Sequence, residues 1–272
     1  MLFSAFSDDC FVCLTFLDIK LIKDIPGTRS TDLIQSTNSP MQGLPANIFK
    51  SGILRCAKSN NRPAPSLFSF LGLTSLPFHA TSNFDWVVSL ESKTDEIREE
   101  YNRYATSTTS DYEMKADEHS LHNGEWEWRS YIKKGIKDSS FAENNPITAN
   151  SLSLIPDLQT DIPFAYSFFS TMKPGTSIDT HTAPCNIRLR GHLPLIVPEG
   201  DVGINVGGKT IKYEVGKLVI FDDSFPHEAW HNGEDKDRVL LLFDFWHPDL
   251  TWSERASIVE MFEIAQQQST EQ

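Results

Sequence analysis

Six short segments rich in β-branched and aromatic residues constrain the fold of this 272-residue chain most strongly. Turn signals such as Pro174-Gly175 and Asn232-Gly233 separate them. Several short strands punctuated in this way are typical of an all-β barrel or sandwich. The segments are 164–172, 187–197, 202–206, 210–215, 218–221 and 238–245.

Helical periodicity appears on both sides of this β-rich region. Residues 85–105 place five residues on one face, which predicts an amphipathic helix. Those residues are Val87, Leu90, Thr94, Ile97 and Tyr101. Near the C-terminus, Thr251-Trp-Ser-Glu254 has the pattern of a capping box, and the apolar residues Ile258, Phe262 and Ala265 follow it. We therefore expect helices to flank the barrel and to cover one of its sheets.

The N-terminal part of the chain differs in composition from the rest. Residues 33–84 contain four basic residues, no Asp or Glu, and many Ser, Pro and Asn. We expect residues 1–83 to form an N-terminal extension and 84–272 to form the folded domain. The extension reads either as a poorly ordered leader or as part of an organellar transit sequence. Acidic residues within 1–32 argue against the second reading, so the expected location is cytoplasmic or organellar.

Charge, hydropathy and cysteine content exclude several classes of protein. A net charge of −13 argues against a nucleic-acid partner, because phosphate binding needs Lys and Arg. No apolar run approaches the length of about 20 residues that a transmembrane helix needs, so we expect a soluble protein. The four cysteines are too few for a disulfide framework, and Cys10 and Cys13 lack the second pair that a zinc site requires.

Two histidines in the β-rich region carry the strongest chemical signal. His181 and His227 lie in separate strand-like segments, and two imidazoles from distant strands are a common way for a small β-barrel to hold a redox metal. The usual third ligand is a carboxylate two residues after the first histidine, where this chain has Ala183. Asp179 could share the strand face of His181 and is a weaker substitute ligand.

Four ordered motifs allow a comparison with a known family. They are Phe-Ser-Thr-Met-Lys-Pro-Gly-Thr (169–176), His-Thr-Ala-Pro-Cys-Asn-Ile-Arg-Leu-Arg-Gly-His-Leu (181–193), Gly-Lys-Leu-Val-Ile-Phe-Asp-Asp-Ser-Phe-Pro-His-Glu-Ala-Trp (216–230) and Arg-Val-Leu-Leu-Leu-Phe-Asp-Phe-Trp-His-Pro-Asp-Leu-Thr (238–251). With these motifs, residues 84–255 resemble the aspartyl/asparaginyl β-hydroxylase family of iron- and 2-oxoglutarate-dependent dioxygenases. The resemblance implies a mainly β fold, a double-stranded β-helix of the jelly-roll or cupin-like type with flanking α-helices.

The resemblance also implies roles for individual residues. His181 and His227 correspond to the only protein ligands of Fe(II), because this family has a small residue where Ala183 lies. Open metal positions would then take O2 and 2-oxoglutarate. The implied cosubstrate-binding residues are Arg238 and Ser170 at the distal carboxylate, Arg190 and His192 at the carboxylate nearest the metal, and Trp126 at the border of the pocket.

Plainer readings remain open at these positions. They are a structural salt bridge for Arg238, a buried structural role for His192 and core packing for Trp126. His231 and His247 match no ligand position and read as surface residues.

The implied reaction is hydroxylation of an unactivated C–H bond, most naturally the β-carbon of an Asp- or Asn-type residue or amino acid. Amino-acid, peptide and lipid substrates all remain open. The alternatives are a hydroxylase of a lipid acyl chain, a non-catalytic cupin-like binding module, and a zinc or manganese enzyme on the same barrel.

Overall fold

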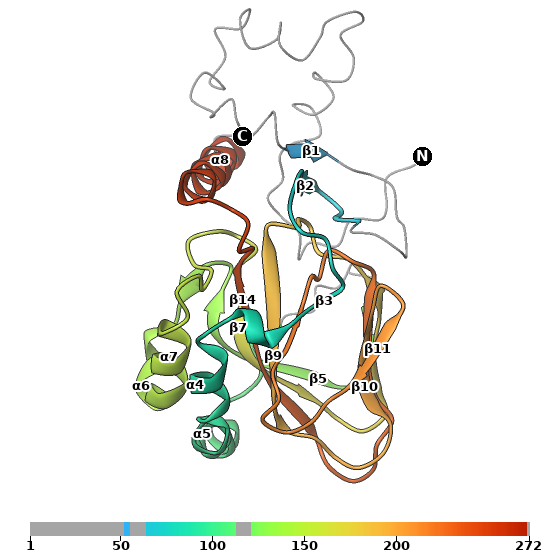
Figure 1. Cartoon of the computed structure of the whole chain (residues 1–272). Coiled ribbons are helices and arrows are strands. Elements are labelled where there is room, and N and C mark those ends of the chain that lie inside the picture. Colours follow the sequence, from blue (N-terminus) through green and yellow to red (C-terminus); the bar gives the residue numbers. More distant parts are fainter. Residues whose placement is uncertain (1–51, 55–63, 113–120, 271–272) are drawn as a thin grey trace, which may run out of the picture.

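Two facing antiparallel sheets form the body of the protein. The structure is a computed structural model that describes residues 52–54, 64–112 and 121–270 (Figure 1). The larger sheet has the strand order β3-β12-β9-β14-β7-β5-β6, and the smaller has β11-β10-β13-β8-β4. A separate two-stranded ribbon pairs β1 (Gly52–Leu54) with β2 (Phe68–Phe70).

Eight consecutive strands are divided between the two sheets, and the chain changes sheet at each step except from β10 to β11, which form a hairpin in the smaller sheet. They are β7 (Ser167–Met172), β8 (Thr176–His181), β9 (Arg188–Ile196), β10 (Val202–Val206), β11 (Lys209–Lys212), β12 (Val219–Phe221), β13 (His227–His231) and β14 (Arg238–Trp246). In each sheet four of these strands are neighbours, in the orders β12-β9-β14-β7 and β11-β10-β13-β8. This order is that of a double-stranded β-helix, so the expected fold class is confirmed.

Additional strands and helices extend this barrel. The short strands are β3 (Phe78–His79), β4 (His122–Asn123), β5 (Trp126–Lys133) and β6 (Ile136–Lys137). The helices are η3 (Thr81–Asn83), α4 (Val87–Glu91), α5 (Thr94–Ser107), α6 (Ser139–Asn144), α7 (Pro146–Ser153) and α8 (Trp252–Thr270). Figure 1 shows α4 to α7 on the side of the larger sheet that faces away from the smaller one.

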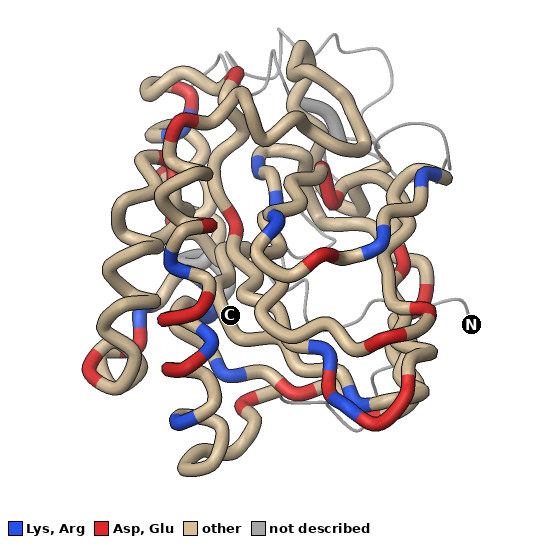
Figure 2. The backbone as a smooth tube through the Cα atoms, turned by 60° about the horizontal axis from the view of Figure 1, so that its bottom comes forward, with Lys and Arg blue, Asp and Glu red and all other residues tan. Residues whose placement is uncertain are grey.

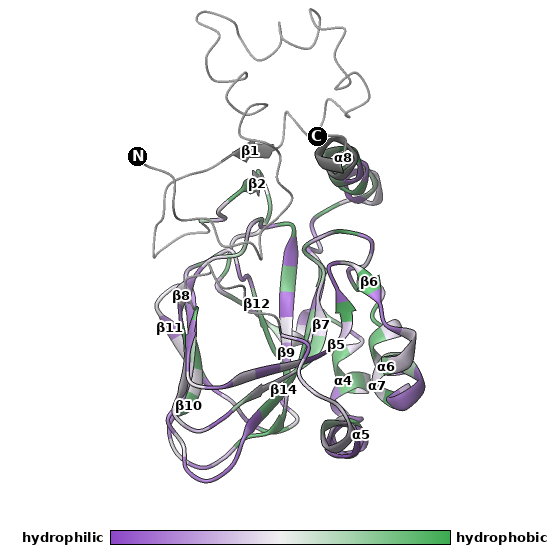
Figure 3. Ribbon diagram, turned by 180° about the vertical axis from the view of Figure 1, so that it is seen from behind, coloured by the Kyte–Doolittle hydropathy of each residue, from purple (hydrophilic) through white to green (hydrophobic). Residues whose placement is uncertain are grey.

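The larger sheet separates two hydrophobic cores. In β9, Leu189 and Leu193 pack in the core beneath the helices, whereas the intervening Arg190 and His192 point into the barrel. Figure 3 shows this alternation of hydrophobic and hydrophilic positions along β9. The barrel core is smaller and contains Val202, Ile204, Val206, Tyr213, Val219, Phe221, Phe225 and Leu240.

One glycine is required where β9 passes close to β14. A Cβ atom at Gly191 would lie 2.4 Å from Cζ of Phe243, which is fully buried. Because Gly191 separates Arg190 from His192, this close packing of strand on strand also fixes the position of both side chains.

The predicted N-terminal helix is interrupted. Residues 85–105 form α4 and α5, which meet at Ser92 and Lys93, although all five predicted face residues are buried. Ser92 and Thr94 donate side-chain hydrogen bonds to the carbonyls of Ser89 and Glu91, at 2.7 Å each. Hydroxyls that compete for backbone acceptors in this way weaken a helix, and here the helix ends and restarts.

The C-terminal helix begins as predicted. The backbone N–H of Thr251 donates to Glu254 Oε2 at 2.9 Å, and the N–H of Glu254 donates to Thr251 Oγ1 at 3.3 Å. This reciprocal pair is a capping box. Ile258, Phe262 and Ala265 are buried on one face of α8.

The domain starts earlier than the boundary predicted at Phe84. Residues 64–83 pack against the barrel: Ala64 is 2% exposed, and β3 pairs with β12 as the edge strand of the larger sheet. The prediction is therefore wrong for this stretch, because its Ser/Pro-rich composition conceals a segment held by backbone pairing. Residues 1–51 and 55–63, with Cys10 and Cys13, lie outside the described residues.

Charge is spread over the described part of the chain. Figure 2 shows Lys and Arg positions interspersed with Asp and Glu on helices, strands and loops. Within the same residues, none of the helices combines the length and the apolar character that crossing a bilayer would require.

Candidate active site

His181 and His227 come together inside the barrel. They are direct register partners in the β8–β13 pairing, and their ring centroids lie 4.1 Å apart. Each Nδ1–H donates to the carbonyl two residues earlier in its own strand region, Asp179 O at 2.8 Å and Phe225 O at 2.9 Å. This backbone bonding fixes the tautomer and leaves both Nε2 lone pairs free to bind a metal ion.

Electrostatics keep this pair neutral. Burial lowers the pKa of His227 well below its usual range, and the neighbouring His181 lowers it further. Burial likewise lowers the pKa of His181. Unprotonated imidazoles are the form that binds metal ions.

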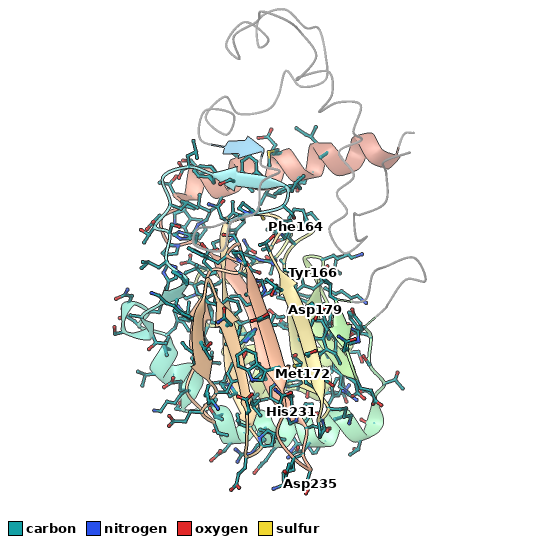
Figure 4. The ribbon with its side chains drawn as sticks, turned by 90° about the vertical axis from the view of Figure 1, so that its right-hand side faces the viewer. Phe164, Tyr166, Met172, Asp179, His231 and Asp235 are labelled. Atoms are coloured by element: carbon teal, nitrogen blue, oxygen red, sulfur yellow. The ribbon has the colours of Figure 1, made fainter. Side chains whose placement is uncertain are left out.

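A bulge in β8 aims His181 into the barrel. Ile178 pairs with Ala229 and His181 with His227, so two β8 residues, Asp179 and Thr180, oppose a single residue of β13. The extra residue puts Ile178 and His181 on the same face, although they are three apart. Asp179 is therefore turned outward and exposed, so the structure does not support it as a substitute ligand (Figure 4).

No side chain of the described residues replaces the missing carboxylate. Ala183 is buried at 5% exposure, and its N–H donates to Asp223 O at 2.8 Å. Among the described residues, no His, Cys, Asp or Glu joins the two histidines in a group of three that could hold a metal.

Arg238 lies in the barrel interior, where none of the described carboxylates pairs with it. It pairs in register with Met172, it is 2% exposed, and its Nε and Nη2 atoms have no hydrogen-bond partner among the described residues. Burial lowers the pKa of Arg238 to about 10. A buried guanidinium is costly unless an anion compensates it, so this end of the barrel is suited to binding one. The salt bridge that was the plainer reading of Arg238 is absent among the described residues.

His192 lies between this end and the histidine pair. Burial and the charge of Arg238 lower its pKa well below the usual range, and His227 contributes to the same shift. His192 Nδ1 is hydrogen-bonded to the hydroxyl of Tyr213 at 2.9 Å, whereas its Nε2 is buried without a partner. His192 therefore presents one unused polar atom to the interior.

Ser170 and Trp126 are in direct contact. Trp126 Nε1 donates to Ser170 Oγ at 2.9 Å, and Ser170 is 2% exposed on the inner face of β7. In the register of the sheet, Ser170 pairs with Leu240, two residues along β14 from Arg238. The serine hydroxyl keeps its own proton available for a second hydrogen bond. Trp126 thus does more than fill space in the core.

Arg190 belongs to a cluster of buried charges. Its Nε and Nη2 donate to the two carboxylate oxygens of Asp244 at 2.7 and 3.0 Å, and its Nη1 lies 3.5 Å from Asp223. Arg188 pairs with the same two carboxylates at 2.6 and 3.0 Å. Although burial alone would raise the pKa of Asp223, the two arginines lower it to about 2. The charge of Arg190 is therefore already compensated, although the resemblance implied that it binds the cosubstrate carboxylate nearest the metal.

Two histidines expected at the surface are buried, so that prediction is wrong. His231 is fully buried, with Nε2 donating to Lys236 O and Nδ1 accepting from the N–H of Gly233. His247 is 1% exposed and is bonded by the backbone of Thr74 and Asp249. Backbone groups engage both nitrogens of each ring, so neither histidine is a free ligand.

Four residues at the site were not predicted from the sequence. They are Arg188, Tyr213, Asp223 and Asp244. Asp244 and Arg238 are the two charged residues of the otherwise apolar β14, so Asp244 carried the same signal as Arg238. Asp223 lies within the motif 216–230, four residues before His227. Tyr213 carried no signal, because only the tertiary fold brings it to His192.

Comparison with known proteins identifies the family. The profile described as Aspartyl/Asparaginyl beta-hydroxylase matches residues 91–248. The chain belongs to this family. Among its relatives, the Aspartyl/asparaginyl beta-hydroxylase of Homo sapiens is 32% identical over 196 residues, covering 71% of this chain and 26% of the relative. This chain therefore spans about a quarter of that relative's length.

Two further relatives differ in name. The Aspartate beta-hydroxylase domain-containing protein 2 of Xenopus tropicalis is 30% identical over 210 residues, covering 75% of this chain and 56% of the relative. The Ornithine lipid ester-linked acyl 2-hydroxylase of Rhizobium tropici is 31% identical over 179 residues, covering 63% of this chain and 61% of the relative. The family thus includes members named for amino-acid residues and for lipids.

A solved structure shows a more distant likeness. The prolyl-4-hydroxylase of Pseudomonas putida has a TM-score of 0.35 and 15% identity, covering 58% of this chain and 87% of that one.

Proposed function

We propose that this chain is an Fe(II)- and 2-oxoglutarate-dependent hydroxylase whose only protein metal ligands are His181 and His227. The observation that carries the proposal is the buried Arg238 guanidinium, two of whose nitrogen atoms find no partner in the described part of the barrel that holds the histidine pair. A dicarboxylate fits this arrangement, since one carboxylate would compensate Arg238 and the other would reach His192 Nε2.

Each residue has a separate role in this proposal. The Nε2 lone pairs of His181 and His227 hold the metal, and their Nδ1–H bonds orient the rings. Arg238 and Ser170 bind the distal carboxylate, with Trp126 orienting the serine hydroxyl. His192 donates to the carboxylate nearest the metal.

Arg190 has a weaker role than Arg238 in this scheme. Asp244 and Asp223 already balance its charge, so the proposal assigns it a smaller share of cosubstrate binding. When bound, Fe(II) with 2-oxoglutarate and O2 would supply the oxidising power for C–H hydroxylation, with succinate and CO2 as the coproducts. The protein contributes position, charge compensation and exclusion of water.

The substrate proposed first is the β-carbon of an Asp- or Asn-type residue or amino acid, in line with the names of the animal relatives. A lipid acyl chain is the second candidate, because the Rhizobium tropici relative is named for that activity. A screen of peptides, amino acids and acyl lipids for products heavier by one oxygen atom separates the two.

The decisive test is succinate formation from 2-oxoglutarate with Fe(II), in wild type and in His227→Ala. We expect turnover in wild type and loss of at least about 100-fold in the variant, because one of two ligands is gone. His231→Gln is a matched control, since its side chain lies in the same strand and is held by backbone groups. No succinate from the wild type with iron would contradict the proposal and favour a binding module or a zinc or manganese enzyme of another activity, because Zn2+ has no redox chemistry.

Iron retention gives a second prediction. Two neutral imidazoles place less negative charge on the metal than two imidazoles and a carboxylate, so we expect mild dialysis against EDTA to remove the iron. Ala183→Asp supplies a carboxylate at the usual position and should slow the loss. Metal content by mass spectrometry checks this, and iron that survives prolonged dialysis of the wild type would contradict it.

A further inference from the structure

Tyr213 touches both of the buried residues that have unused polar atoms. Its hydroxyl is 2.9 Å from His192 Nδ1, and Cζ of Arg238 lies 5.9 Å from the centroid of its ring. Tyr213 follows β11 and is 7% exposed in the barrel core. Tyr213 therefore lies against both side chains, through its hydroxyl at His192 and through its ring at Arg238.

The hydroxyl of Tyr213 is a hydrogen-bond donor. Burial raises the pKa of Tyr213, so the phenol keeps its proton at neutral pH. Within the described residues, His192 Nδ1 is the polar atom to which this hydroxyl is hydrogen-bonded. A buried hydroxyl that does not donate loses the free energy of a hydrogen bond, so the proton points to Nδ1 and that nitrogen accepts.

This hydrogen bond decides which nitrogen of His192 carries the proton. A neutral imidazole has one donor and one acceptor nitrogen, so an accepting Nδ1 leaves the proton on Nε2. Nε2 is the buried atom without a partner. An N–H at this place can donate to a carboxylate oxygen, whereas a lone pair there would repel it.

We propose that Tyr213 is a positioning residue that prepares the site for an anion: its hydroxyl holds His192 as the Nε2–H tautomer, and its ring supports the Arg238 guanidinium. The two contacts are independent, because one uses the phenol oxygen and the other the ring face. This inference rests on the proposed function only for the identity of the anion, 2-oxoglutarate.

Two substitutions separate the contacts. Tyr213→Phe removes the hydroxyl and keeps the ring, and Tyr213→Leu removes both. Tyr101→Phe is the matched control, because Tyr101 is also buried and its hydroxyl also forms a 2.9 Å hydrogen bond, to Thr171 on the helix side of the larger sheet. The Tm of each of the three variants shows how much stability is lost when a buried group is removed, independently of any effect on the site.

The first measurement needs neither metal nor cosubstrate. Nitrogen-15 NMR of histidine-labelled, metal-free protein identifies the protonated nitrogen of His192, with His192→Asn assigning the signal. We expect Nε2–H in wild type and in Tyr101→Phe, and a mixture of tautomers in Tyr213→Phe. A protonated Nδ1 in the wild type, or an unchanged tautomer in Tyr213→Phe, overturns the proposal.

The second measurement is the affinity for 2-oxoglutarate, by calorimetric titration of protein loaded with Mn(II). We expect the Kd to rise roughly tenfold in Tyr213→Phe and further in Tyr213→Leu, with no change in Tyr101→Phe. In turnover the loss should appear in KM for 2-oxoglutarate and little in kcat. Equal affinities for wild type and Tyr213→Phe would overturn the proposal. Absence of 2-oxoglutarate binding in the wild type would remove the proposed function and leave the tautomer result standing.

Discussion

Single residues in this barrel are arranged for binding at a cost in stability. Arg238 and His192 are both buried with polar atoms that have no partner within the described ranges, whereas Arg188 and Arg190 share two buried carboxylates. Unpaired buried groups lower the free energy of unfolding, so their retention is explained more readily by a ligand than by folding.

Arg238→Met tests this directly. Met has a similar length and no charge, so the barrel interior no longer carries an uncompensated guanidinium. We expect the ligand-free protein to gain about 1–3 kcal/mol in its free energy of unfolding, measured in urea, while binding of 2-oxoglutarate is lost. Arg129→Met is the control, because Arg129 is equally buried but bonded to Glu127 and Thr108, so its replacement should destabilise. A destabilised Arg238→Met would mean that the guanidinium has a partner in solution.

His79 provides a pH-dependent test far from any catalytic role. Burial, with a contribution from His247, lowers its pKa to about 4, although Asp249 and the carbonyl of Leu76 act in the opposite direction. The folded pKa lies below the unfolded value of about 6.5, so between these values the unfolded chain binds a proton that the folded chain does not. The stability contribution is therefore complete above pH 6.5 and falls as the pH falls toward 4.

The measurement compares variants, because burial raises the pKa of Asp222 to about 7 and that carboxyl changes stability in the opposite direction. We expect Tm to fall less between pH 7 and pH 4.5 in His79→Gln than in wild type. Parallel Tm curves would show that His79 titrates normally in the fold.

At the scale of elements, a short N-terminal strap braces the loops beside the site. The strap is residues 64–70, and its backbone N–H groups donate to Ser224 O, Ala183 O and Pro184 O at 2.7 to 3.0 Å. These carbonyls lie just after His181 and just before His227. Asn186 fastens the other end, accepting from Phe70 N–H at 2.7 Å and donating to Phe70 O at 2.9 Å.

Asn186→Ala should release this strap. Both hydrogen bonds are buried, so we expect a loss of about 1–3 kcal/mol in stability and faster amide hydrogen exchange at Phe68 to Phe70. Asn144→Ala is the control, since its side chain donates within its own exposed helix end and should have little effect. Unchanged exchange in the strap after Asn186→Ala would show that the remaining backbone bonds are sufficient to hold it.

At the scale of the whole molecule, the larger sheet has the main hydrophobic core on one face and the candidate site on the other. Its helix side carries an aromatic-rich core, and its barrel side carries the site with a smaller core. Figure 4 shows the strands running past Met172 and His231 at one end of the barrel toward Phe164 and Tyr166 at the other. Substitutions on the two sides of one sheet should therefore have different consequences.

Phe141→Leu and Phe221→Leu make a matched pair. Both rings are fully buried, but Phe141 extends from α6 into the core on the helix side of the sheet. Phe221 contacts His192 and His227 at centroid distances of 4.8 and 5.7 Å. We expect each to lose roughly 1–3 kcal/mol of stability. Only Phe221→Leu should also weaken 2-oxoglutarate binding, measured by calorimetry. Equal effects on binding would mean that the two cores are not independent.

Much of the architecture was accessible from the chain itself. Runs of β-branched and aromatic residues separated by turn signals predicted most strands of the barrel, and the Thr251–Glu254 pattern predicted the start of α8. β5, β8 and β13 lie outside the six predicted segments, although His181 and His227 already indicated strand-like surroundings at one end of β8 and of β13. β8 and β13 are short and rich in polar residues, and backbone pairing holds them together. The segment 64–83 was assigned to a leader for the same reason.

The sequence by itself determined most of the strand pattern, the flanking helices and the histidine pair, because periodicity and residue type are local properties, and the resemblance to a family implied the other candidate residues of the site. Tertiary structure alone decided which polar atoms are paired. The β8 bulge turns Asp179 outward, Asp223 and Asp244 satisfy Arg190, and Arg238 is left without an anion. Pairing depends on contacts between strands far apart in the chain, and the free energy of burying a charge depends on those contacts.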